Sequence, residues 1–242
     1  MSDNIAEKYP NYSPGLEGVI AGISSISEID SDRSSLQYRG YDVHDLAERG
    51  SYEECAYLLL YKKLPSQSEL AEFRSVLAAE REVPSYIYDI LSAMPKKSHP
   101  MDLVRTAYSA LAPSDPDYTK PSTDHDANVR KAVRIVAKAS TIVGNCHRIR
   151  NGLEPLKPNP NHTIAENFLA LFSGKDPIPK TVEVMDASLC LYAEHGFNAS
   201  TFANRVTVAT LSDLYSGVVS GIGTLRGPFQ CQFPHYLATL RQ

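Results

Sequence analysis

The residue in this sequence best placed to do chemistry is His195, which lies between the acidic Glu194 and a predicted turn at Gly196–Asn198. An imidazole there can donate a hydrogen bond to an anion, or to a carbonyl oxygen that gains negative charge during a reaction. A single histidine in such a context is more often structural. The position of His195 alone therefore leaves both interpretations open.

Other patterns that would define a site are weak or missing. The sequence has no phosphate-binding GxxxxGK[ST] loop, no dinucleotide-binding glycine pattern and no G-x-S-x-G nucleophile motif. We interpret His99 as a helix start, Arg39 as a member of a structural ion pair, and the basic residues 147–150 as a solvated turn. We predict no bound metal and no bound cofactor, because four further histidines lack the spacing of metal ligands: His44, His125, His147 and His162.

Composition bounds the class of protein. The 242 residues carry a net charge of -4, with 43% hydrophobic and 21% charged residues, which is typical of a globular protein and not of a nucleic-acid binder. No apolar run approaches the ~20 residues of a membrane helix, and the first residues do not resemble a signal peptide, so we expect a cytoplasmic protein. We predict reduced core thiols at three of the scattered cysteines, Cys55, Cys146 and Cys190, and leave Cys231 unassigned.

The segment Leu191–Pro228 must position His195. We expect it to form one central helix, buried on most sides, with Ser200 as its N-cap. The small residues Gly217, Ser220 and Gly221 lower helix propensity but allow neighbouring backbones to approach closely.

The rest of the chain predicts an all-α domain with a small N-terminal β element. Residues 16–39 predict a hairpin around a turn at 31–32. From residue 41 onward the apolar residues follow the helical period, with capping signatures at Ser51, Ser66 and Thr163. A long helix after the loop 113–126 should bury one apolar face. We expect its basic residues to lie mostly off that face: Arg130, Lys131, Arg134 and Lys138.

Motifs spread over the chain resemble the citrate synthase family, which includes citrate and 2-methylcitrate synthases. The run EHGFNASTFANR at 194–205 is similar to the family's EHxxNASTFxxR sequence, and it leads to the Gly227–Pro228 pair that opens the family's Gly-Pro-Leu-His-Gly-Gly motif. Four weaker matches occur in the family's order: GLEGV at 15–19, YRGY at 38–41, HPM at 99–101 and NFLALFSG at 167–174.

The resemblance implies an acyltransferase that condenses acetyl-CoA with oxaloacetate to citrate in the tricarboxylic acid cycle. It implies that His195 hydrogen-bonds oxaloacetate and that Asn198 forms the turn and lines the site. Acetyl-CoA would be a co-substrate, and the protein would be a homodimer. The family's chemistry also needs an aspartate base and two further histidines, because removing a proton from a thioester methyl group requires a base and an oxyanion donor together.

The chain departs from the family pattern after Pro228. Gln230 occupies the position of the family's first catalytic histidine, and a glutamine amide donates a hydrogen bond but does not titrate. His235 matches neither of the missing histidines. The aspartate, the second histidine, the arginines that bind oxaloacetate and most of the smaller domain would lie beyond Gln242.

We therefore expect a polar arm (1–15), a partial large helical domain of citrate synthase type (16–228) and a divergent tail (229–242), with no intact catalytic residue and no activity by the chain alone. Two alternatives stay open. The chain could belong to a 2-methylcitrate synthase that uses propionyl-CoA, or it could be a non-catalytic partner that dimerises with an intact synthase.

Overall fold

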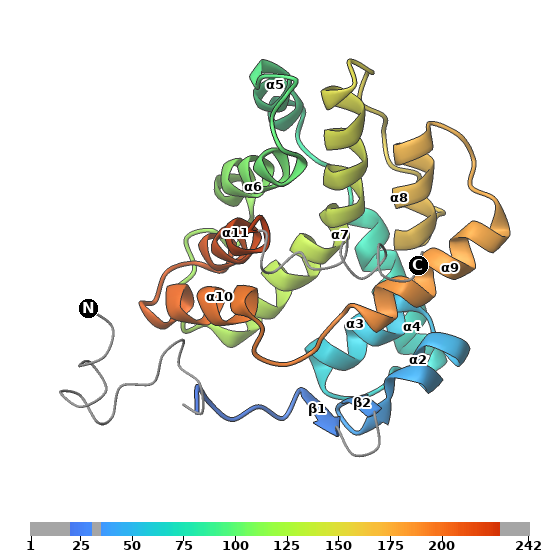
Figure 1. Ribbon diagram of the computed structural model, residues 1–242, viewed down its shortest axis with the longest axis vertical. Helices are drawn as coiled ribbons and strands as arrows, with labels where there is room; N and C mark the ends of the chain where they lie inside the picture. Colours follow the sequence, from blue (N-terminus) through green and yellow to red (C-terminus); the bar gives the residue numbers. More distant parts are fainter. Residues whose placement is uncertain (1–19, 31–34, 228–242) are drawn as a thin grey trace, which may run out of the picture.

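The computed structural model describes residues 20–30 and 35–227, which form a helical domain with a three-stranded sheet at its N-terminal end (Figure 1). The predicted arm, the turn at 31–32 and the divergent tail lie outside these residues. The strands are β1 (Ser27–Asp30), β2 (Ser35–Tyr38) and β3 (Tyr41–Asp42). The helices are α2 (Val43–Arg49), α3 (Tyr52–Tyr61), α4 (Gln67–Ala79), α5 (Ser85–Ala93), α6 (Pro100–Leu111), α7 (His125–Arg150), α8 (Ile164–Ser173), α9 (Pro179–Leu191), α10 (Ala199–Ala209) and α11 (Leu214–Leu225), with a 3-10 turn, η2, at Ala112–Ser114.

The predicted hairpin is confirmed. Strands β1 and β2 pair antiparallel, with Ile29 opposite Leu36, and β3 extends the sheet from β2. Tyr38, at the end of β2, is completely buried against α2, α3 and α9. The sheet therefore carries a side chain into the helical core at the place where α9 ends.

The helix starts follow the predicted capping signatures. Ser66 and Thr163 form full capping boxes, in which side chain and backbone bond reciprocally. Ser51 caps α3, but its hydroxyl donates to Glu54 and the reciprocal half of the box is absent. His99 caps α6 through its ring Nδ1, which confirms its role as a helix start.

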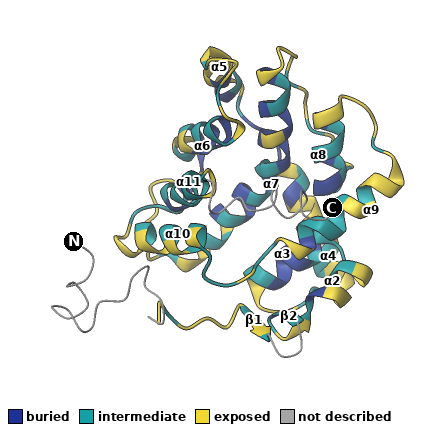
Figure 2. Cartoon of the chain, in the orientation of Figure 1, coloured by how far each residue is buried: buried dark blue, intermediate teal, exposed yellow. Residues whose placement is uncertain are grey.

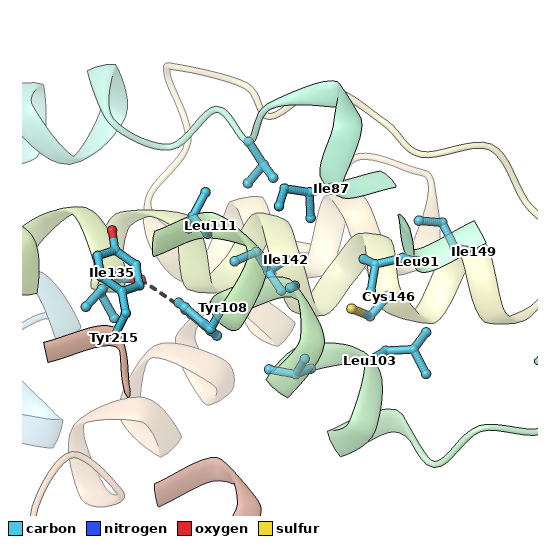
Figure 3. Packing of buried hydrophobic residues seen from close by; sticks show 13 residues of the cluster. Ile87, Leu91, Leu103, Tyr108, Leu111, Ile135, Ile142, Cys146, Ile149 and Tyr215 are labelled. Atoms are coloured by element: carbon cyan, nitrogen blue, oxygen red, sulfur yellow. Dashed lines mark hydrogen bonds between the residues drawn. The ribbon is translucent and has the colours of Figure 1, made fainter. Parts of the chain in front are cut away.

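Helix α7 is the longest helix and lies at the centre of the described fold (Figure 1). One side of it packs against α5, α6 and α11 through a cluster that includes Ile87, Tyr108, Ile142 and Tyr215 (Figure 3). A second cluster joins α7 to α3, α4 and α8. The three predicted core thiols are buried and unpaired, as expected: Cys55, Cys146 and Cys190.

The prediction that the basic residues of α7 lie off its buried face is wrong for two of them. Lys131 and Arg134 are 1% and 7% exposed. Arg134 donates to Asp115 (2.8 and 2.7 Å) and to Asp117 (2.6 Å), both in the loop 113–126. The hydroxyl of Tyr215 in α11 also donates to Asp115 (2.8 Å). Charge pairing, which helical periodicity does not reveal, buries this arginine.

The prediction of one central buried helix is also wrong. Residues 191–227 form the end of α9 and two helices, because Leu211 adopts a positive φ of 64° and Asp213 caps a new helix. Helix α10 has no buried residue within the described part of the chain, and its outer face is largely exposed (Figure 2). The close approach of backbones is confirmed at Gly221, where a Cβ would lie 3.4 Å from the backbone oxygen of Ser200, while a Cβ on Gly217 would overlap the Asn204 side chain of α10.

No helix among residues 20–30 and 35–227 is long and apolar enough to span a bilayer.

Candidate functional site

The turn that carries His195 is fastened to the N-terminal hairpin. The buried Tyr38 hydroxyl lies 3.0 Å from the Cys190 carbonyl oxygen and 3.1 Å from that of Leu191, and it accepts from the Glu194 amide at 3.3 Å. Burial raises the pKa of Tyr38 to about 12, so the phenol stays protonated and can donate. One side chain of β2 therefore fixes the C-terminal end of α9.

The side chain of Glu194 makes a second connection. Its Oε1 accepts from the Ser27 hydroxyl at 3.1 Å and from the amide of Gly196. Gly196 has a φ of 90°, with open space where a Cβ would be, so backbone conformation and not crowding requires glycine there. Glu194 thus shapes the turn, and one of its oxygens is engaged twice.

Asn198, and not Ser200, caps α10, which corrects the predicted N-cap. Its Oδ1 accepts from the Thr201 amide at 2.8 Å. Because the cap fixes the oxygen, the amide nitrogen of Asn198 faces Nε2 of His195 at 3.2 Å. This orientation makes Nε2 an acceptor, so the neutral ring carries its proton on Nδ1. The two predicted site residues are brought together, and one orients the other.

His195 is exposed, and Asn198 is half-buried. Neither residue lines the cavities beside α4, beside α5 or beside the hairpin in the described part of the chain. A polar cavity of about 490 Å³ lies beside the hairpin and is lined in part by Ser27 and Arg39. The His195 ring is therefore presented on the outer side of the turn.

Arg205 is a neighbour that sequence reasoning did not select. Its guanidinium lies 4.2 Å from the ring centroid of Phe197, in the same turn as His195. It also lies against Gly22, where a Cβ would come within 2.8 Å of Nη2. Its position three residues after Phe202, in the run that includes His195, is the sequence signal that could have identified it. The cation contributes positive charge close to the turn.

The remaining predicted residues have structural contacts. Arg39 forms no ion pair with another described residue; it donates instead to the Ser25 carbonyl and hydroxyl, at 3.1 and 3.0 Å. The basic residues 147–150 belong to the last turn of α7, where His147 stacks on Phe172 at 3.8 Å. Gln230 lies outside the described residues.

The turn supplies hydrogen-bond donation and positive charge. A neutral imidazole with its proton on Nδ1 can polarise a ketone, and the nearby guanidinium favours a negatively charged ligand. Among residues 20–30 and 35–227, no group of three histidine, cysteine or acidic side chains is arranged to hold a metal ion. The geometry fits recognition of an anionic carbonyl compound.

Comparison with known proteins shows which family the chain resembles. The family model "Citrate synthase, C-terminal domain" matches residues 15–235. Citrate synthase 2 of Bacillus subtilis is 46% identical over 217 residues, which cover 88% of this chain and 57% of that protein. The 2-methylcitrate synthase of Mycobacterium tuberculosis is 43% identical over 227 residues, covering 94% of this chain and 57% of that protein.

Solved structures agree. Citrate synthase from Pyrobaculum aerophilum superposes with a TM-score of 0.86 at 36% identity, covering 90% of this chain and 56% of that one. A ternary complex of citrate synthase from Thermoplasma acidophilum with carboxymethyl coenzyme A and oxaloacetate gives a TM-score of 0.84 at 30% identity, with coverage of 90% and 57%. This chain spans a little over half the length of these relatives. In sequence and in fold, it belongs to the citrate synthase family.

Proposed function

We propose that this chain supplies the keto-acid-binding portion of a citrate synthase, which condenses acetyl-CoA with oxaloacetate to form citrate in the tricarboxylic acid cycle. The observation that carries the proposal is the pairing of His195 with the helix cap Asn198, at 3.2 Å, in a chain of this family. The bond to the cap orients the imidazole and favours the tautomer with its proton on Nδ1. A donor held in this way before substrate arrives is suited to a ketone oxygen that becomes an alkoxide.

In this proposal His195 donates from Nδ1 to the ketone oxygen of oxaloacetate, and Asn198 holds the ring by donating to Nε2. Arg205, over Phe197, adds positive charge near the substrate carboxylates. Tyr38 acts one step further away, because it fixes the end of α9 from which the turn departs.

We further propose that the 242-residue polypeptide alone does not form citrate. Deprotonation of a thioester methyl group needs a carboxylate base and an oxyanion donor close to each other. The carboxylate next to His195 is Glu194, whose Oε1 already accepts from Ser27 and Gly196. At the position of the family's first catalytic histidine the chain has Gln230, which does not titrate.

A second candidate is 2-methylcitrate synthase, with propionyl-CoA in place of acetyl-CoA. The 43% identity to the 2-methylcitrate synthase of Mycobacterium tuberculosis supports it as directly as the 46% identity to Citrate synthase 2 supports the first. The two substrates differ by one methylene in the acyl group. The pairing of His195 with Asn198 addresses the keto acid, which both reactions share.

A third proposal is that the chain dimerises, with itself or with an intact synthase, in the cytoplasm. Large apolar side chains on α9 and α10 support it: Val184, Phe202 and Val206 are 59%, 37% and 55% exposed. Exposed apolar surface of this kind marks a place where another chain can pack.

A chimera tests the proposed function. Residues 1–227 are joined to the part of Bacillus subtilis citrate synthase 2 that follows the matched region, and release of free CoA is measured with oxaloacetate present. We expect oxaloacetate-dependent release with acetyl-CoA or propionyl-CoA, and the preferred thioester assigns the acyl group. In the chimera, His195→Ala should lower kcat/KM by at least about a hundredfold, as expected for a lost oxyanion donor.

A folded chimera that binds oxaloacetate and gains no activity would contradict the proposal, as would activity unaffected by His195→Ala. Free CoA released by the 242-residue chain alone would refute its inactivity. Sedimentation of that chain, alone and mixed with an intact synthase, tests dimerisation; a monomer under both conditions would exclude it.

A further inference from the structure

A cavity that lies away from His195 is found between α4 and the segment that leads into α8. Its volume is about 640 Å³. It shares no lining residue with the turn at 194–198. Its polar lining comes from α3, α4, the segment just after α4 and the segment just before α8: Glu53, Arg74, Ser75, Arg81, Asn161, His162 and Thr163.

Two of the lining side chains are charged and almost completely buried. Glu53 is 1% exposed, and its Oε1 accepts from the Ile164 amide at 2.8 Å. Arg81 is 2% exposed, and its Nη1 donates to the carbonyl oxygens of Asn159 (2.8 Å) and His162 (2.7 Å). These bonds hold the start of α8 against α3 and α4. They engage Oε1 of Glu53 and Nη1 of Arg81.

Other polar atoms of the cavity wall lack a hydrogen-bond partner. Glu53 Oε2, Arg81 Nε and His162 Nδ1 are buried without a hydrogen-bond partner among the described residues. His162 Nε2 lies 3.0 Å from the Asn159 side-chain amide, so in the neutral ring Nδ1 is the donor. Of the five unsatisfied buried side-chain atoms in the described part of the chain, three belong to this one cavity wall. Such groups are rare in folded proteins and usually gain a partner from water, an ion or a ligand.

The unsatisfied atoms define the chemistry of the partner. Two donors, on Arg81 and His162, call for an acceptor, and the free oxygen of Glu53 calls for a donor. The cavity wall also includes the exposed Arg74, so two guanidinium groups face one carboxylate. Burial lowers the pKa of Arg81, because its charge is only partly compensated by Glu53 and Glu166. The two guanidinium groups of the cavity wall favour an anion.

We propose that this cavity binds a small hydroxylated anion. Its negatively charged oxygens would accept from Arg81, His162 and Arg74, and its hydroxyl would donate to Glu53. A hydroxycarboxylate and a glycerol-type phosphate ester share this chemistry. Because the anion would join α3, α4 and the start of α8, its binding should also stabilise the folded domain.

Calorimetric titration and thermal unfolding of the full chain test the proposal. The probes are citrate, glycerol 3-phosphate and uncharged glycerol, and the protein carries His195→Ala so that the candidate keto-acid site does not contribute. We expect saturable one-site binding of citrate or glycerol 3-phosphate with a rise in Tm, and no binding of glycerol. Binding of citrate would identify the ligand as a hydroxycarboxylate, and binding of glycerol 3-phosphate would identify it as a phosphate ester.

Two variants locate the site. Arg74→Gln removes one cation and should weaken binding by at least about tenfold, the value of one charged hydrogen bond. Ser75→Phe fills the cavity and should weaken binding by at least about tenfold by excluding the anion. Ser68→Phe, on the same helix but outside the cavity, should bind like the parent. Equal binding by Ser75→Phe, an equal effect of glycerol, or no saturable binding of either anion up to about 10 mM would overturn the proposal. The last outcome would mean that water alone fills the cavity. The chimera assay does not depend on this result.

Discussion

Two polar regions of the domain, one beside α11 and one beside α10, differ in how completely their polar side chains are paired within the protein. In the loop–α7 cluster (Asp115, Asp117, Arg130, Arg134 and Tyr215), the charged side chains meet at 2.6–3.0 Å and Asp115 is only 6% exposed. In the His195 turn (Glu194–Asn198), the imidazole is exposed, and no residue of the neighbouring helix α10 is fully buried.

The difference separates a structural role from the binding role proposed for His195. The loop–α7 cluster pairs its buried charges within the domain, so it fixes α7 and α11 and has little left to offer a ligand. The His195 turn is fixed from behind by Tyr38 and Glu194, while its ring carries a donor on the outer side. Rigid support of an exposed polar group is what a substrate-binding residue requires.

Removing the central cation should have the largest effect. Arg134→Met leaves the carboxylate of Asp115 buried without its charge partner, and loss of one partner from a buried pair costs about 3–5 kcal/mol of unfolding free energy. Urea denaturation followed by circular dichroism measures it. Arg49→Met, in an exposed pair with Asp45, should change stability by less than about 0.5 kcal/mol. Equal effects would show that the loop–α7 cluster is not the stabilising feature described here.

Removing the support of the His195 turn should have the second-largest effect on unfolding free energy. Tyr38→Phe removes a buried hydroxyl that contacts two carbonyl oxygens and one amide, and should cost about 1–3 kcal/mol of unfolding free energy. Tyr41→Phe, at an exposed position in β3, is the matched control and should be nearly neutral. If thermal unfolding did not distinguish the two variants, the turn would not depend on the hairpin.

Gly196 tests the backbone of the same turn. Gly196→Ala places a Cβ at a φ of 90° and should destabilise the fold by about 1–2 kcal/mol. Gly223→Ala in α11 should have the opposite sign, with a gain of up to about 1 kcal/mol, because the new methyl meets Arg105 only at 3.5 Å. Chemical denaturation of both variants provides the comparison; a loss at Gly223 as large as that at Gly196 would contradict it.

The smallest effect at neutral pH concerns Arg130. Hydrogen bonds from Arg130 and Arg134 hold the pKa of Asp117 well below its usual range. Stability from this group is therefore complete above about pH 4, the pKa of an unfolded aspartate, and is lost as pH falls through the lower folded value. Arg130→Gln should raise the folded pKa and move acid unfolding to higher pH. Lys180→Gln, in an exposed pair, should leave the acid transition unchanged; an identical acid transition in Arg130→Gln would contradict this assignment.

The sequence predicted elements that depend on local signals. The hairpin, the capping boxes at Ser66 and Thr163 and the helix start at His99 follow from residue types at fixed spacings. The burial of Arg134 did not, because it depends on Asp115, which lies 19 residues away in a loop. The helix break at Leu211 and Asp213 was missed because an apolar residue at positive φ leaves no compositional signal. His195 and Asn198 were found through the family run, while the hairpin contacts of Glu194 and Tyr38 join strands to a turn more than 150 residues away.

The central claim, that His195 binds the keto acid, is tested most directly by titrating oxaloacetate into the 242-residue chain and following the ring signals of His195 by NMR. The account predicts a saturable shift of those signals, and binding at least about tenfold weaker in His195→Ala than in His44→Ala, an exposed histidine outside the turn. Unchanged ring signals, or equal affinity in the two variants, would contradict it.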